Sequence, residues 1–223
     1  MAVRKKYKFA VIATDVVLFT VRDEKLQVLL IKMKKPPFEG QWAVPGGLVR
    51  PKESVDESAR RHLKDEAGVK NVYLEQLYTF GKVDRDPFGR VVSVAYFALV
   101  PHSRFILKTT DLYEDVAWFP VAALPKLAYD HREIIGFAEK RLMTKVEYSN
   151  IVYSLLPAEF SLGELQKVYE IILNRALDKR NFRKKILSLG LLKNLGKKRA
   201  GGANRPAELY TFKKHVPQLV ELV

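Results

Sequence analysis

The chain has 223 residues, of which 48% are hydrophobic and 29% charged, a balance that excludes an intrinsically disordered protein. It contains no cysteine, which excludes disulfide bonds, thiolate zinc sites and cysteine nucleophiles. The net charge of +14 favours a polyanionic partner such as nucleic acid. Residues up to Thr144 carry a net +6 and those from Lys145 onward a net +8, so we expect the polyanion to bind the C-terminal third.

The N-terminal segment is basic and then apolar, which superficially suggests a secretory signal. Asp15 interrupts the apolar run, and no small-residue cleavage site follows it. No stretch of the sequence reaches the ~20 apolar residues of a membrane helix. We therefore expect a cytoplasmic protein with no membrane partner.

The first 144 residues predict a domain of mixed α and β structure. Ser54 and Glu57 have the spacing of a capping box, which predicts a helix that ends near Gly68. Asp130 and Glu133 have the same spacing before a second helix. Runs of Val, Ile, Phe and Thr predict strands at residues 9–21, 27–32, 72–83, 91–100 and 116–119.

The remaining residues predict three helices and then a two-stranded hairpin, the order of a winged helix-turn-helix. A short helix is expected at 147–155, a second begins at Ser161 with Glu164 completing its capping box, and a third runs from Asp178 to Gly190. Strands are expected at 191–195 and 208–213, around a loop at 196–207. We therefore expect one domain over residues 1–144 and a DNA-binding domain over residues 145–223.

Two basic runs fall on the two parts of a winged helix that touch DNA. The last helix of such motifs enters the major groove, and arginine and asparagine suit contacts with base edges. Phe182, Ile186 and Leu187 are expected to face the core of the domain. A glycine-rich basic loop can follow the phosphate backbone, and the alternative for both runs is a solvated charged face. The predicted DNA-binding residues are Lys179, Arg180, Asn181, Arg183 and Lys184 on the helix, and Lys197, Lys198, Arg199 and Arg205 in the loop.

Residues 47–69 resemble the signature of the Nudix hydrolases, because seven fixed positions match at the family's spacing. The resemblance implies an α/β/α sandwich with a mixed sheet, so the fold class expected for the whole chain is α+β, with the winged helix second. It also implies a magnesium site that serves pyrophosphate cleavage. The matching residues are Gly47, Glu53, Arg61, Leu63, Glu66, Gly68 and Val69.

The predicted metal face departs from the family pattern. Positions 62, 65 and 66 share one face of a helix, and where the family has three glutamates this chain has His62, Asp65 and Glu66. A neutral imidazole is a poorer Mg²⁺ ligand than a carboxylate, and misplacing a catalytic group by ~1 Å costs about 10²-fold in rate. We therefore assign no catalytic residue and predict weak or absent hydrolysis. The alternative is that Asp65, Glu66 and Glu53 still bind enough magnesium for slow turnover.

A turn at residues 85–90 carries side chains suited to a nucleotide. Guanidinium groups match phosphate oxygens and an aromatic ring stacks on a base. The alternative is a solvated turn whose charges are incidental. Together with Arg61, the predicted effector-binding residues are Arg85, Asp86, Phe88 and Arg90.

Taken over nearly its whole length, the chain resembles the NrtR family, the Nudix-related and winged-helix transcriptional regulators of bacterial NAD metabolism. That resemblance implies a homodimer that represses transcription from a double-stranded DNA operator, needs no cofactor to bind DNA and is released by ADP-ribose or a related nucleotide. It rests, beyond the Nudix signature, on residues 72–77, Arg85, Asp86, Gly89, residues 128–131, Phe182, Arg183, and residues 205–207 and 209–210.

Two alternatives stay open from the sequence. One is an active, magnesium-dependent ADP-ribose pyrophosphatase, alone or as a bifunctional protein. The other is a regulator that responds to a sugar such as arabinose.

Overall fold

The computed structural model describes residues 9–102, 113–201 and 204–220. It describes the side chains of all these residues except 200, 201, 204 and 205. The chain divides into two compact units. The first contains most residues up to Glu139, and the second contains Lys140–Val223 together with Thr20–Leu26 and Val100–Arg104. The expected boundary after residue 144 lies within the helix α2 (His131–Tyr148).

Within the described residues, the first unit is built around a seven-stranded sheet. Strand β1 is parallel to β6, whereas the pairs β1–β4, β2–β7, β2–β3 and β5–β6 are antiparallel. The sheet is therefore mixed, as expected. Its strands are β1 (Val11–Arg22), β2 (Lys25–Met33), β3 (Trp42–Ala43), β4 (Gly46–Leu48), β5 (Tyr73–Phe80), β6 (Val91–Leu99) and β7 (Tyr113–Pro120).

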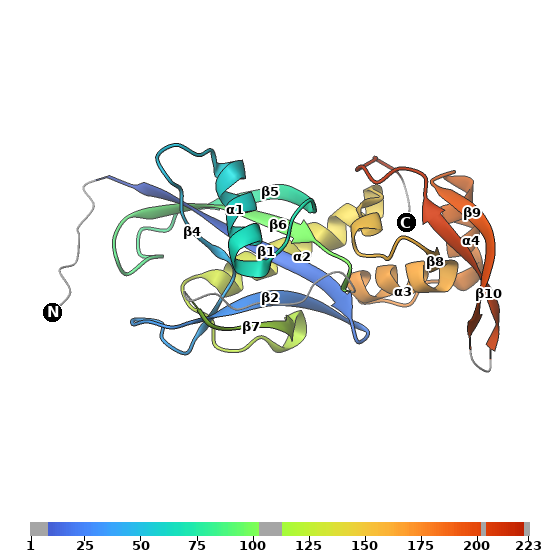
Figure 1. The fold of residues 1–223 in the computed structure, drawn as a ribbon, viewed down its shortest axis with the longest axis horizontal. Coiled ribbons are helices and arrows are strands. Elements are labelled where there is room, and N and C mark those ends of the chain that lie inside the picture. Colours follow the sequence, from blue (N-terminus) through green and yellow to red (C-terminus); the bar gives the residue numbers. More distant parts are fainter. Residues whose placement is uncertain (1–8, 103–112, 202–203, 221–223) are drawn as a thin grey trace. The chain divides into compact units, whose positions relative to one another are not determined.

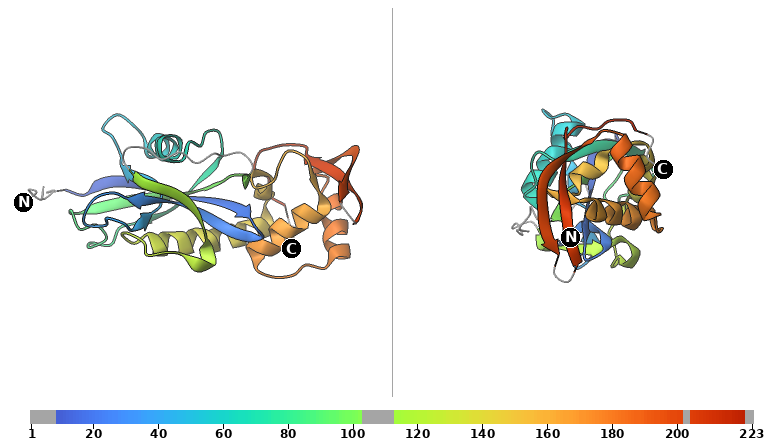
Figure 2. Two further views of the ribbon diagram at one scale, coloured as in Figure 1. Left: turned by 60° about the horizontal axis from the view of Figure 1, so that its bottom comes forward. Right: turned by 90° about the vertical axis from the view of Figure 1, so that its right-hand side faces the viewer.

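Helices lie on the two opposite faces of this sheet: α1 (Val55–Ala67) on one and α2 on the other (Figures 1 and 2). Ser54 and Glu57 form the predicted capping box, and Gly68 ends α1 in the left-handed conformation that glycine adopts without strain. A short 3₁₀ helix, η2 (Val121–Ala123), follows β7. Asp130 precedes α2 as predicted, but its two carboxylate oxygens accept hydrogen bonds from Arg85.

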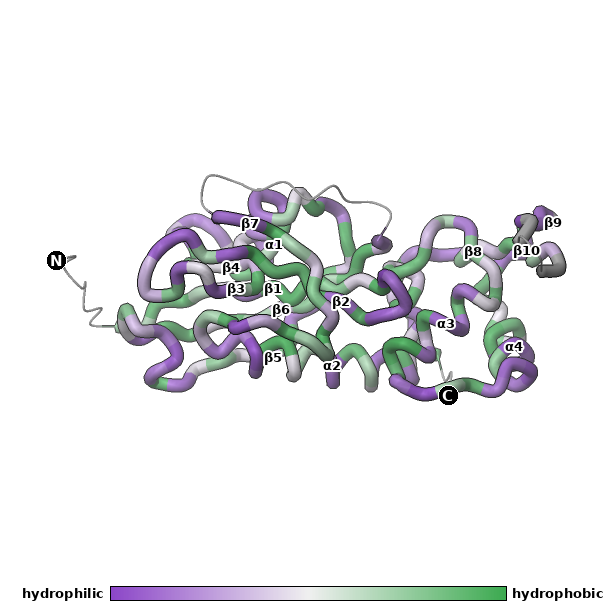
Figure 3. Tube along the Cα trace, turned by 90° about the horizontal axis from the view of Figure 1, so that it is seen from below, coloured by the Kyte–Doolittle hydropathy of each residue, from purple (hydrophilic) through white to green (hydrophobic). Residues whose placement is uncertain are grey.

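The core lies where the central strands are covered on both faces. Val16, Val17, Leu18 and Phe19 are consecutive residues of β1 and all are fully buried, as are most residues of β6. Such continuous burial requires apolar side chains on both faces of a strand. Figure 3 shows the same property as hydrophobic colouring along β1 and β6. A polar residue within these strands is therefore buried too, and needs partners.

The second unit is a winged helix, whose elements follow α2 in the expected order. It consists of η3 (Ile151–Ser154), β8 (Phe160–Ser161), α3 (Leu162–Leu173), α4 (Lys179–Ser188), β9 (Leu192–Gly201) and β10 (Asn204–Phe212), with the strands in the order β8-β10-β9. Two expectations were wrong. The short helix at 147–155 is the end of α2 followed by the 3₁₀ turn η3, and most of the loop at 196–207 belongs to the long strands β9 and β10.

The core of the winged helix forms between α3 and α4. The apolar residues Leu165, Val168, Tyr169 and Ile172 of α3 are buried, and the ring of Tyr169 lies 5.5 Å from that of Phe182 on α4. Ile186 is buried one turn after Phe182. Leu187 was expected to join them but is 46% exposed, because it lies 100° further around the helix than Ile186. No helix in the described parts of the chain combines the length and apolarity needed to cross a membrane.

Candidate functional site

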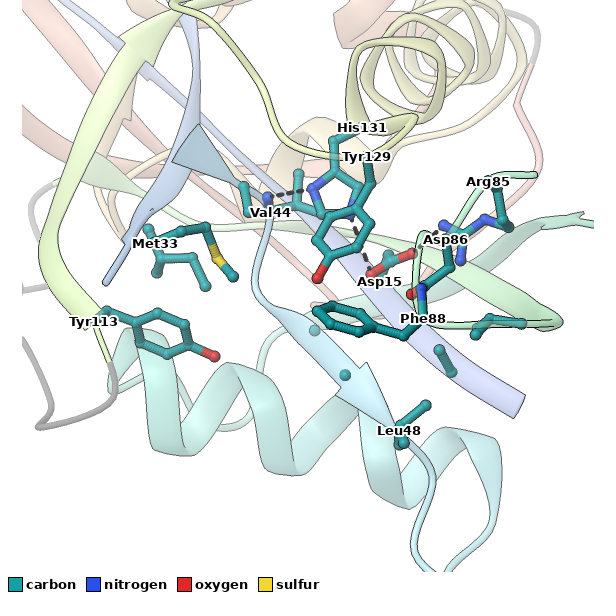
Figure 4. A pocket seen from close by; sticks show the side chains of 16 residues that line it. Asp15, Met33, Val44, Leu48, Arg85, Asp86, Phe88, Tyr113, Tyr129 and His131 are labelled. Atoms are coloured by element: carbon teal, nitrogen blue, oxygen red, sulfur yellow. Dashed lines mark hydrogen bonds and ion pairs between the residues drawn. The ribbon is translucent and has the colours of Figure 1, made fainter. Parts of the chain in front are cut away.

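The first unit contains a pocket of about 250 Å³, near the lower end of the volumes of ligand sites. Its wall comes from β1, the end of β2, the segment from β3 to β4, the turn at 85–91 and the residues that precede α2 (Figure 4). The described side chains that line it and that Figure 4 labels are Asp15, Met33, Val44, Leu48, Arg85, Asp86, Phe88, Tyr113, Tyr129 and His131.

A buried polar network surrounds Asp15 at the pocket wall. Ser93 Oγ and Arg85 Nη2 donate to Asp15 Oδ2 at 2.6 Å and 3.0 Å. His131 Nε2 lies 3.5 Å from Asp15 Oδ1. Burial alone would raise the pKa of Asp15, but His131, Arg85 and Ser93 together lower it to about 2. Asp15 is therefore a carboxylate at neutral pH.

His131 is fixed in one tautomer by the backbone. The amide of Val44 donates to His131 Nδ1 at 3.1 Å, so that nitrogen carries no proton. The proton of the neutral ring is then on Nε2, which faces Asp15. The ring of His131, at the start of α2, therefore lies between the backbone that follows β3 and the carboxylate of Asp15.

The guanidinium of Arg85 is shared between two carboxylates. It donates to Asp130 from Nε and Nη2, at 2.9 Å and 2.7 Å, in addition to its bond with Asp15. Only 3% of its side chain is exposed. Arg85 therefore lines the pocket, as predicted for an effector contact, while its charge is balanced within the protein.

The other predicted effector residues divide between the pocket and its surroundings. Phe88 lines the pocket and is 47% exposed, and the carboxylate of Asp86, also in the wall, accepts from the Phe88 amide at 2.8 Å. Arg90 donates to the carbonyl oxygens of Gly81 and Lys82. Arg61 lies on α1 and forms a two-pronged ion pair with Glu53. The pocket brings three of the five predicted residues together.

On the predicted metal face of α1, the carboxylate of Glu66 is already hydrogen-bonded within the protein. His62 Nδ1 donates to Glu66 Oε1 at 2.5 Å, and the amide of Gly46 donates to Glu66 Oε2 at 3.0 Å. Asp65 is exposed, whereas His62 and Glu66 are buried. A hydrogen bond from Arg61 lowers the pKa of Glu53 to about 2, so both remain charged.

The side chains present do not fit the all-oxygen site that magnesium prefers. Among the described residues no group of three or more His, Cys, Asp or Glu side chains is placed to hold a metal. The imidazole of His62 lies beneath Gly47, where a Cβ would be 3.0 Å from the ring. His62 therefore fills space near the pocket and takes up one oxygen of Glu66.

The predicted DNA-binding residues of α4 form an exposed polar face. Phe182 and Ile186 anchor the opposite face in the core, and Asp178 caps the helix by accepting from the Asn181 amide at 2.8 Å. Lys179 and Arg183 also line a groove of about 670 Å³ with Tyr210 of β10 and the start of α3. The exposed residues are Lys179, Arg180, Asn181, Arg183 and Lys184.

The predicted loop cations lie on strands. Lys197 pairs with Glu159 at 3.1 Å, and Arg199 donates to Glu164 at 2.8 Å. Lys198 is exposed on β9, and the side chain of Arg205 is outside the described atoms. The described cations of the hairpin therefore lie along β9, and two of them are paired with glutamates.

Two protein families match separate parts of the chain. Residues 12–136 match the NUDIX domain, and residues 152–212 match the NrtR DNA-binding winged helix domain. An ADPR responsive transcriptional repressor, NtrR, of Acinetobacter baylyi is 34% identical over 94% of this chain and 84% of its own length. The chain belongs to the NrtR family.

Related structures extend the likeness to the fold. Shewanella oneidensis NrtR in complex with a 27mer DNA is 36% identical, with a TM-score of 0.81 over 91% of this chain and 93% of its own. The NUDIX domain of the same protein in complex with ADP ribose is 36% identical, with a TM-score of 0.55 over 61% of this chain and 90% of its own. An ADP-ribose pyrophosphatase of Methanocaldococcus jannaschii is 37% identical over 59% of this chain and 76% of its own length.

Sequence reasoning missed the inner wall of this NrtR pocket. Tyr129 has a positive φ of 51°, and its ring lies 4.3 Å from Phe38 and 5.2 Å from His131. Burial, with the charges of Asp86 and Asp15, raises its pKa to about 12. Residues 128–131 entered the sequence analysis only through the family resemblance, and Asp15 only as a break in an apolar run. The sequence signal that could have identified Asp15 is its charge within a strand of otherwise apolar residues.

Proposed function

We propose that this NrtR protein is a homodimeric transcriptional repressor that binds operator DNA through its winged helix and releases it when ADP-ribose or a related nucleotide binds the Nudix-like unit. The observation that carries the proposal is the exposed face of α4, which presents Lys179, Arg180, Asn181, Arg183 and Lys184 to solvent. Such a face suits both base edges and phosphates. The complexes of Shewanella oneidensis NrtR with DNA and with ADP ribose support both halves of the proposal.

Binding without turnover is the second part of the proposal. Hydrolysis in the Nudix fold relies on metal-held carboxylates, and here Glu66 is bonded to His62 and Gly46 while Glu53 is bonded to Arg61. The pocket is then a sensor that needs no magnesium, and the winged helix needs no cofactor. The role implies a cytoplasmic location, where operator DNA and NAD-derived nucleotides occur together.

Helix α2 supplies a route from effector to DNA-binding unit along the chain. His131 is its first residue and lines the pocket, and Asp130 before it is held by Arg85. The helix continues through Lys140, where the second unit begins, to Tyr148. An effector shifts the balance between two states only if it binds one of them more tightly. Contacts at the start of α2 are where such a preference would arise.

A mobility-shift assay with DNA from upstream of the protein's own gene tests the function. We expect a shift that ADP-ribose reverses and that an equal concentration of arabinose leaves unchanged. Reversal by arabinose alone would assign the sugar-responsive alternative, and absence of a shift would refute DNA regulation. Incubation of the same protein with ADP-ribose and Mg²⁺ tests turnover, because a rate near the ~10 s⁻¹ typical of enzymes would assign a hydrolase.

A further inference from the structure

We propose that Asp15 and Tyr129 recognise an uncharged, hydrogen-bond-donating part of the effector, either the hydroxyl pair of the distal ribose (the ribose not joined to adenine) or the adenine amino group, and that the phosphates bind away from these two residues. This inference rests on the proposed function and specifies which chemistry its pocket reads.

One oxygen of Asp15 is available to a ligand. Oδ2 accepts from Arg85 and Ser93. Among the described contacts Oδ1 has only the Nε2 of His131, at 3.5 Å, which is beyond the usual range of about 2.7–3.2 Å for such a bond. Gly46 preserves the space beside this oxygen, since a Cβ at that position would lie 2.6 Å from Oδ1. Asp15 lines the pocket, so a donor group placed there would complete its hydrogen bonding.

The charge of the pocket disfavours phosphate at this end. Among the described lining residues Asp15 and Asp86 are acidic, and the cation Arg85 also serves the buried carboxylate of Asp130. The three carboxylates outnumber the single guanidinium. A phosphate would meet net negative charge here, whereas a hydroxyl or amino group would meet an acceptor.

Aromatic rings complete a surface for a sugar face or a base. A positive φ is rare for a residue as bulky as Tyr129, and it persists only where the surroundings hold it. The rings of Phe38 and His131 hold Tyr129 so that it lines the pocket. Phe88, half exposed, lines the same pocket (Figure 4). The hydroxyl of Tyr129 stays protonated at neutral pH and serves as donor or acceptor.

Calorimetry on the unmodified protein tests the inference with three ligands. ADP-ribose is the reference, ADP lacks the distal ribose, and inosine diphosphate ribose lacks the adenine amino group. We expect one analogue to bind at least tenfold more weakly, because it leaves Asp15 without its donor, and the identity of that analogue assigns the group. Both analogues binding within threefold of ADP-ribose would overturn the inference while leaving the proposed function intact. If ADP-ribose itself failed to bind, the proposed function would be refuted and the inference with it.

Variants then assign the effect to the residues. Asp15→Asn should weaken the binding of ADP-ribose at least tenfold and that of the sensitive analogue less than threefold. The variant would then bind the two ligands with similar affinity, as a double cycle of residue and ligand changes requires. Tyr129→Phe should weaken ADP-ribose about threefold. The matched control is Asp115→Asn, an exposed acid-to-amide change on β7 outside the pocket wall. DNA binding without effector reports folding. If Asp15→Asn does not fold, the analogue series and Tyr129→Phe still test the inference. If both variants fold and both still bind ADP-ribose more tightly than the sensitive analogue by the full original factor, the inference is overturned.

Discussion

Replacing Arg85 with Met should destabilise the first unit more than its place in a surface turn would suggest. The change removes the only cation that bonds to both Asp15 and Asp130 among the described contacts, and leaves two carboxylates with side chains 8% and 11% exposed. Breaking a buried ion pair from one side costs about 3–5 kcal/mol. Arg90→Met is the matched control, because Arg90 lies in the same turn and bonds only to carbonyl oxygens in the described contacts. Its loss should cost about 1 kcal/mol.

The pH dependence of this penalty identifies its cause. In the unmodified protein the pKa of Asp15 is lowered from 3.8 to about 2, which corresponds to roughly 2 kcal/mol of stability. That contribution is complete above pH 3.8 and is lost as the pH falls through 2. In Arg85→Met the guanidinium no longer lowers the pKa of Asp15, while burial, the largest single cause, still raises it, so we expect the pKa to rise. The variant should therefore lose less stability than the unmodified protein as the pH falls and protonates the carboxylate.

Urea denaturation of both variants between pH 7 and pH 4 measures the effect. The difference between Arg85→Met and the unmodified protein should be largest at pH 7 and should shrink toward pH 4. A difference below 1 kcal/mol at pH 7, or one that does not change with pH, would show that the carboxylates do not depend on Arg85 for their charge balance.

Three further outcomes follow from the structure. Arg183→Ala should weaken operator binding by ~1–3 kcal/mol, roughly 5- to 150-fold, in a titrated mobility shift. The control Arg175→Ala removes an exposed arginine paired with Glu147 and should change operator binding less than twofold. Equal effects of the two variants would show that α4 does not contact the DNA. His62→Glu should place two carboxylates together and make thermal stability rise with added Mg²⁺, and a melting temperature indifferent to Mg²⁺ would contradict this account of the metal face. Tyr78→Glu should weaken the dimer in sedimentation analysis, because Tyr78 is 53% exposed and stacks on the exposed Phe137 at 4.9 Å; an unchanged mass would assign the dimer to another surface.

Two helix starts were readable from the sequence because both partners of each capping box lie within one turn of the helix. Ser54 with Glu57 and Ser161 with Glu164 form capping boxes in the structure as the spacing predicts. The order of elements in the winged helix follows from the same kind of signal. These features need no knowledge of which segments meet in space.

The pocket could not be derived in this way because its partners are distant in the chain. Asp15 meets Arg85 and Ser93 at separations of 70 and 78 residues, and His131 is the first residue of α2. On the sequence alone Arg85 has the features of a surface turn residue, and only the pairing of β1 with β6 brings Ser93 opposite Ala13, two residues before Asp15. The prediction that Arg85 binds the effector was made without knowledge of the two carboxylates that the fold brings to it, and it stays a prediction.

A repressor released by a nucleotide has to distinguish that nucleotide from the other phosphates of the cell. The exposed cations of α4 offer no such distinction, because phosphate contacts carry no information about the group attached. A pocket whose single lining arginine is balanced by Asp15 and Asp130 gains little from phosphate charge, so its selectivity has to come from the neutral parts of the ligand. ADP-ribose differs from ADP and ATP in having an uncharged group at both ends. An acidic, aromatic pocket in the first unit and the exposed cations of α4 in the second therefore suit two different tasks: the cations respond to phosphate in any molecule, and the pocket responds to the groups that the phosphates join.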